Sequence, residues 1–225
     1  MGAAIGDILP LAVGVAISPV PVIAVVLMLG TPRARPNGLA FALGWVVGLT
    51  VVGGVILALA SGNSQADDGG PETWVSVVKL AVGVLFLLLA ARTWRSRPEA
   101  GQEAAMPKWM QAIDTFTTGR SFGFGVLLSG VNPKNLALTI AAATAIAQTG
   151  ISGGEAAGAL AVFILVGSLS ILAPVVIYFA MGAKAAVILD ELRTWMAANN
   201  AAITSVLVLV LGAKLIGDAI AGLSS

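Results

Sequence analysis

The sequence predicts an all-α integral membrane protein with six transmembrane helices. We expect them to form two inverted-topology three-helix repeats, with the first and fourth helices broken near the membrane midplane. Three observations predict this. Of the 225 residues, 58% are hydrophobic and 10% are charged, against roughly 45–50% and about 25% in an ordinary soluble domain. Six apolar windows are close to or above the length of a membrane span. The first and fourth windows contain proline at matching positions.

The six expected spans leave no room for a separate soluble domain. They cover residues 8–30, 38–60, 75–91, 122–148, 156–180 and 202–222, and a span needs about 20 apolar residues. The first window follows no basic residue and precedes no small-residue cleavage pattern, so we expect it to remain as a span rather than to be removed as a signal peptide. We divide the chain into a first repeat (1–91), a cytoplasmic linker (92–121) and a second repeat (122–225).

Outside the expected spans, basic residues occur in alternate loops only. They are Arg33 and Arg35, then Arg92, Arg95, Arg97, Lys108 and Arg120, and finally Lys184 and Arg193. Because loops rich in Lys and Arg stay in the cytoplasm, we expect both termini outside a bacterial cytoplasmic membrane.

In the long linker, Trp109, Ile113 and Phe116 have helical spacing, which predicts a short amphipathic helix at the membrane interface.

The two prolines that define the repeat stand in similar local sequences. Aligning "AISPVPVIAVVLML" with "SGVNPKNLALTIAA" places Ser18 on Asn132 and Pro19 on Pro133. Each half then has three spans, so the second half enters the membrane from the opposite side, as in many secondary transporters. Ser and Asn are good N-caps, and proline suits the first helical position. Each pair therefore predicts a new half-helix that begins roughly 15 Å deep, near the midplane of a core about 30 Å thick. Plain proline kinks are the alternative.

Lys134 is the residue that a kink does not need. A lysine at the bilayer centre costs roughly 2.5–3.5 kcal/mol on insertion scales. It stands at the N-terminus of the half-helix that begins near Asn135, where backbone N–H groups already present positive charge. We therefore expect this site to attract an anion. A partner carboxylate within the protein is the competing explanation.

Other polar and small residues within the spans receive simpler interpretations. Lys79 is expected to extend to the outer surface, and Lys214 to pair with Asp218 four residues later; these three are possible secondary charged sites. Glycines are expected to permit close helix packing. They are Gly44, Gly48, Gly53, Gly54, Gly158 and Gly167.

Several stretches resemble a known family. The runs "GFGVLLSGVNPKNLALTIAAA" and "VVKLAVGVLFLLLAARTWR" resemble the fourth and third spans of the lysine exporter superfamily. The run "AISPVPVIAVVLMLGTPRARPNGLAFALGWVVGL" resembles the start of its GAP branch, the peptidoglycolipid and sulfolipid addressing proteins. The resemblance implies export or delivery of envelope glycolipids. It also implies a substrate-binding or gating region of Ser18, Pro19, Pro21, Asn132, Pro133, Lys134 and Asn135. The "SPVP" run departs from the Pro-Gly-Pro type motif of the amino-acid exporters.

Three functions remain open at this point. The first is a transporter that exports anionic envelope lipids by alternating access around a midplane site. The second exports a small solute, such as an amino acid or an ion. The third is a non-transporting accessory protein for envelope-lipid assembly. Enzymatic activity is not expected, because the chain has no histidine or cysteine and its spans contain no acidic pair. We expect no cofactor, metal or nucleic acid. The expected partners are membrane lipids and an anionic lipid or small-molecule substrate, and a homodimer is possible.

Overall fold

The computed structural model describes residues 1–63, 71–96, 110 and 112–224, and all regular structure in these residues is helical. The helices are α1 (Gly2–Ala16), α2 (Pro19–Leu29), α3 (Ala34–Asn63), α4 (Pro71–Arg95), α6 (Thr118–Val126), α7 (Pro133–Gln148), α8 (Gly153–Met181) and α9 (Ala185–Ser224). Three short segments join them: η1 (Ile113–Thr115), the π-helix η2 (Leu127–Val131) and η3 (Gly182–Lys184). The prediction of an all-helical protein is confirmed.

The apolar helices fit a multi-pass membrane protein. By length and composition, α3, α4, α8 and α9 can each cross a membrane, and α1 with α2 forms a fifth candidate bent by 51°. The expected fourth span corresponds to α6, η2 and α7, of which α6 has 9 residues and α7 has 16. Neither of these two helices is long enough to span on its own, since a span needs about 20 residues.

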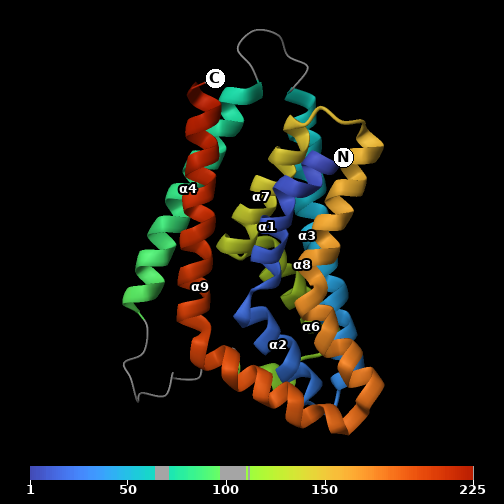
Figure 1. The fold of residues 1–225 in the computed structure, drawn as a ribbon. Helices are drawn as coiled ribbons and strands as arrows, with labels where there is room; N and C mark the ends of the chain where they lie inside the picture. The colour runs from blue at the N-terminus through green and yellow to red at the C-terminus, as the bar shows by residue number, and fades with distance from the viewer. Residues whose placement is uncertain (64–70, 97–109, 111, 225) are drawn as a thin grey trace.

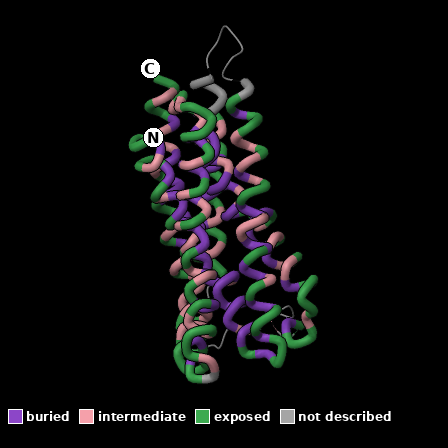
Figure 2. The backbone as a smooth tube through the Cα atoms, turned by 90° about the vertical axis from the view of Figure 1, so that its right-hand side faces the viewer, coloured by how far each residue is buried: buried purple, intermediate pink, exposed green. Residues whose placement is uncertain are grey.

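The outer surface of the bundle is apolar, as lipid contact requires. Figure 2 shows exposed residues along the outside of the helices and buried residues between the helices. Large apolar side chains more than half exposed occur on every helix that can span; examples are Leu59, Leu88, Leu165 and Val210. Lipid tails are as apolar as leucine, so the hydrophobic effect does not drive these helices together, and close packing must do so instead.

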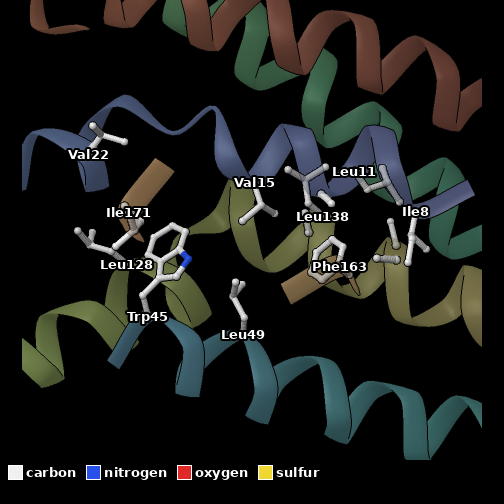
Figure 3. Close-up of a cluster of buried hydrophobic side chains, with 14 of the residues drawn as sticks. Ile8, Leu11, Val15, Val22, Trp45, Leu49, Leu128, Leu138, Phe163 and Ile171 are labelled. Atoms are coloured by element: carbon white, nitrogen blue, oxygen red, sulfur yellow. The ribbon is translucent and has the colours of Figure 1, made fainter. Parts of the chain in front are cut away.

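The most extensive contacts join helices from different parts of the chain. Helix α4 pairs with α9, α3 with α6, and α1 with α8; the α4–α9 pair is visible on the left of Figure 1. Figure 3 shows the packed centre, where Val15 and Leu11 from α1 lie near Leu49 from α3, Leu138 from α7 and Phe163 from α8. All five side chains are fully or almost fully buried. The first and second parts of the chain therefore share one core.

Glycines in α3 bring its backbone against α6 and η2. A Cβ added at Gly44 would overlap the backbone carbonyl of Phe122, and one at Gly48 would overlap Ser129. These two glycines confirm the predicted close packing. Gly54 does not, because a Cβ there would meet nothing within 4 Å.

The other glycines singled out in the sequence contact side chains rather than backbone. A Cβ at Gly53 would lie 2.8 Å from Leu160, and one at Gly167 would lie 3.1 Å from Val15. At Gly158 the nearest atom is the terminal methyl group of Met1, at 2.8 Å. These contacts are close, but flexible side chains make them.

Two segments near one end of the bundle differ from expectation. The predicted interfacial helix of the linker falls largely outside the described residues, Trp109 included. Where it is described, Ile113 is fully buried and Phe116 packs edge-on against Phe124 at 5.5 Å, so these two side chains face protein. Conversely, α9 is a single helix of 40 residues, and its first part runs across the end of the bundle below α2 (Figure 1). The sequence predicted a helix only over 202–222.

Candidate functional site

The two interrupted helices meet where their breaks lie. Helix α1 ends at Ala16 and α2 begins at Pro19, while α7 begins at Pro133. Side chains at the start of α7 reach the end of α1 across sequence separations of 116 to 120 residues. The two breaks therefore lie against each other.

The end of α1 is capped by a side chain from α7. Helix ends leave their last backbone carbonyls without partners, and lipid supplies no donor. The Lys134 Nζ donates to the carbonyls of Gly14 and Ile17, at 2.8 Å each. The Ser18 hydroxyl lies 2.6 Å from the carbonyl of Val15. Together, Lys134 and Ser18 give donors to three carbonyls at this break.

At the start of α2, proline residues reduce the number of backbone N–H groups that need acceptors. Helix starts leave backbone N–H groups without acceptors, and proline has no N–H. Pro19 is the first residue of α2 and Pro21 is the third, and both are buried. The expected N-cap is only half correct, because Ser18 has extended backbone geometry but its side chain makes no capping hydrogen bond to α2. Its hydroxyl instead faces α1 and α7.

The second break uses two asparagines. The Asn132 side chain accepts a hydrogen bond from the backbone N–H of Lys134 at 3.1 Å, which confirms the predicted N-cap. The preceding turn is a π-helix, η2, and π-helical turns are frequent at functional sites. The Asn135 side-chain amide donates to the carbonyl of Leu128 in η2 at 3.0 Å. The first turn of α7 therefore caps both broken helices, α1 through Lys134 and η2 through Asn135.

We call Ser18, Lys134 and Asn135 the central cluster. The Lys134 Nζ donates to the Ser18 hydroxyl at 2.7 Å, and that hydroxyl lies 3.1 Å from Oδ1 of Asn135. The Ser18 hydroxyl has one proton, so it donates either to Asn135 or to the carbonyl of Val15 at any one time. Lys134 is 8% exposed, Ser18 2% and Asn135 0%. A formally charged ammonium is thus held in a buried polar network.

The charge of Lys134 has neutral partners only. Its acceptors are two backbone carbonyls and a hydroxyl, and no ion pair in the described part of the chain includes it. The C-terminal end of α1 carries partial negative charge, which stabilises a cation. The sequence pointed to an anion or an internal carboxylate as the partner of Lys134 and did not indicate these carbonyls. The carbonyls that accept hydrogen bonds at this site belong to Gly14, Val15, Ile17 and Leu128. Every residue type has a backbone carbonyl, so the sequence does not single these residues out.

The remaining predicted site residues lie outside the central cluster. Pro133 is exposed and Asn132 partly so. Lys79 donates to the Gln148 side chain at 2.8 Å, which ties α4 to α7; its extension to the outer surface stays a prediction. The predicted pair of Lys214 and Asp218 is confirmed at 2.6 Å. The hydrogen bonds of these three charged side chains do not involve the central cluster.

The pair of Lys214 and Asp218 is expected to contribute little to stability. Each side chain is 38% exposed, and such partly exposed pairs contribute roughly 0–1 kcal/mol. Replacing Lys214 with methionine should therefore leave the melting temperature in detergent nearly unchanged. A large drop would show that this pair is part of a more deeply buried network.

Comparison with known proteins gives one family match. The family model described as "Sap, sulfolipid-1-addressing protein" matches residues 8–221, and this range includes both breaks and the whole central cluster. Comparisons with curated proteins and with solved structures found no match.

Proposed function

The chain belongs to the sulfolipid-1-addressing protein family, and from this premise we propose that it exports anionic envelope glycolipids across a membrane. The mechanism is alternating access around the central cluster, as in an exporter of the lysine exporter superfamily. The family description supports a role in addressing a sulfated lipid, and the apolar helices support a membrane location. The chemistry of the cluster supports a negatively charged substrate.

The proposed topology has six spans in two inverted repeats. The first repeat comprises α1 with α2, then α3 and α4; the second comprises α6 with α7, then α8 and α9. Three features support it: the matched prolines at the two breaks, the direct contact between the breaks, and the position of both termini at one end of the bundle (Figure 1). We call the opposite end of the bundle the basic end. Its basic residues are Arg33, Arg35, Arg92, Arg95, Arg120, Lys184 and Arg193. We place the basic end in the cytoplasm.

The observation that carries the proposal is the absence of a counter-charge for Lys134 in its described contacts. A buried cation is costly unless it is paired. The hydrogen bonds that Lys134 donates to Gly14, Ile17 and Ser18 use its three N–H groups but leave the charge unpaired. An arriving sulfate or phosphate group supplies the missing charge and can replace these acceptors. The end of α1 then loses its cap, which couples substrate binding to the geometry of the break.

Replacing Asn135 with aspartate tests whether the counter-charge arrives with the substrate. The new carboxylate would stand beside Ser18, which itself lies 2.7 Å from the ammonium, and would supply a permanent internal counter-charge. We expect a folded protein that no longer exports. The measurement is the transfer of a sulfated glycolipid out of proteoliposomes, with an uncharged glycolipid and inorganic sulfate as parallel substrates.

The matched control is Asn135→Leu, which also removes the hydrogen bond to Leu128 but adds no charge. It should lose stability and keep more export than Asn135→Asp. Equal export by the two variants would contradict the anion site. Transport of sulfate with no transport of sulfated glycolipid would point to a small-anion exporter instead.

A further inference from the structure

The first part of α9 cannot lie within the membrane core together with the rest of the helix. Forty residues of α-helix extend about 60 Å, twice the roughly 30 Å of the hydrocarbon core. Figure 1 shows that the helix turns after its first part and then runs along α4. Within this helix, the Asn199 side-chain amide donates to the carbonyl of Trp195 at 2.8 Å, and side chains that bond into the helix backbone are a known cause of bending. We call residues 185–199 the transverse segment.

The transverse segment has three distinct faces. Its inner face, with Leu189 buried and Leu192 and Met196 partly buried, packs against the hydrophobic core. At 100° per residue, Ile188 and Trp195 lie on one flank of this face, and they are 47% and 58% exposed. The opposite flank carries Asp190 and Arg193, which form an ion pair at 2.7 Å. One flank thus carries exposed apolar side chains and the other carries charged ones, while the exposed Glu191 lies between the apolar flank and the outward side of the helix.

This pattern fits a helix that lies in the plane of a membrane surface. Interfacial helices bury one apolar side into the boundary between headgroups and acyl chains, and tryptophan is enriched at that depth. The spanning part of α9 also presents exposed apolar side chains, namely Val206, Leu209 and Val210. A protein partner is not needed to cover the exposed apolar flank.

The charges around the segment indicate which lipids it contacts. The segment belongs to the basic end, where Arg33, Arg92, Arg95, Arg120 and Lys184 are exposed. The acidic residues described at this end are Asp114, Asp190 and Glu191, so basic residues exceed acidic ones. Each exposed Lys or Arg near an anionic leaflet adds to the attraction between protein and lipid.

We propose that the transverse segment is an interfacial helix that binds the anionic lipid surface at the basic end, with Ile188 and Trp195 inserted among the lipids. The opposite flank of Asp190 and Arg193 faces water. The segment connects η3 to the spanning part of α9, so this contact fixes the depth of the α4–α9 pair in the membrane. The inference concerns lipid contact alone and stands independently of the proposed export activity.

Spin labels on single cysteines test the proposal, and the chain contains no cysteine to interfere. Ile188→Cys and Asp190→Cys are both at exposed positions, two residues apart on different flanks. In vesicles that contain phosphatidylglycerol, the label at 188 should collide more with oxygen, which concentrates in lipid, than with a water-soluble nickel chelate. The label at 190 should show the reverse ratio. Leu209→Cys, on the spanning part of α9, is the lipid-facing control.

Two comparisons decide the outcome. If both flanks are equally accessible to the nickel chelate, or if both are shielded from it and from oxygen, the segment is not interfacial and the proposal is wrong. The contribution of charge is tested with vesicles of phosphatidylcholine alone, in which the label at 188 should move towards water. Identical accessibility in the two kinds of vesicle would overturn the requirement for anionic lipid.

Discussion

Replacing Lys134 with methionine is expected to abolish export and to lower stability. The substitution removes the only charge in the central cluster and leaves the carbonyls of Gly14 and Ile17 without the donor that now satisfies them. Each buried acceptor left without a donor costs about 1–3 kcal/mol, partly offset because a buried charge is also removed. Glycolipid transfer from proteoliposomes measures the first effect, and thermal unfolding in detergent measures the second.

Two further variants separate the charge of Lys134 from its role as a cap. Glutamine keeps N–H donors without a charge, whereas arginine keeps both. If an anion binds here, Lys134→Arg should retain more export than Lys134→Gln at similar stability. Wild-type export by Lys134→Gln would show that the residue only caps α1. Lys79→Met is a matched control, because Lys79 also donates to a neutral oxygen but lies outside the cluster.

Gly44→Ala is expected to be among the most destabilising single-methyl additions in this chain. The new Cβ would overlap the backbone carbonyl of Phe122, and a backbone atom cannot rotate away as a side chain can. Overpacking a core costs typically 1–3 kcal/mol, and occasionally more. We expect a loss at or above about 3 kcal/mol, measured as a lower melting temperature and reduced recovery of monodisperse protein in size-exclusion chromatography.

Gly54→Ala is the internal control for that experiment. It lies in the same helix, and its added Cβ would meet nothing within 4 Å. Since alanine favours helix over glycine by up to about 1 kcal/mol, this variant should unfold at the same temperature as the wild type or slightly above it. If Gly44→Ala and Gly54→Ala have equal melting temperatures, the close approach of α3 and α6 does not contribute to stability as described.

The features of the fold that local physics dictates were predictable from the sequence. Runs of apolar residues predicted the helices α3, α4 and α8, because only a helix satisfies its own backbone in lipid. Pro19 and Pro133 predicted where α2 and α7 begin, because proline suits the first helical position and lacks an N–H. The first part of α9 was missed because its mixed polar and apolar composition gives no long hydrophobic run, and its position depends on the end of the bundle against which it packs.

The candidate site was predictable in its side chains but not in its contacts. A lysine between two amides in an apolar run marked Lys134 as unusual. Its acceptors could not be read from the sequence because they are backbone carbonyls on a helix about 120 residues away, and any residue type has a carbonyl. The break at Ser18 could have indicated these acceptors, because it leaves the last backbone carbonyls of the first helix without donors. A helix that ends inside lipid needs donors for them, and Lys134 is the donor-rich side chain at the matching break.

The capping of α1 by α7 also sets an order of events during synthesis. The carbonyl of Gly14 emerges from the ribosome 120 residues before the ammonium that satisfies it. At about 5–20 residues per second, this delay is roughly 6–24 s. During that time the first span enters the membrane with an unfinished end, which water or the insertion machinery must hydrogen-bond. Completion of α1 thus waits for α7, and a chain truncated before residue 134 should leave its first half open to proteolysis.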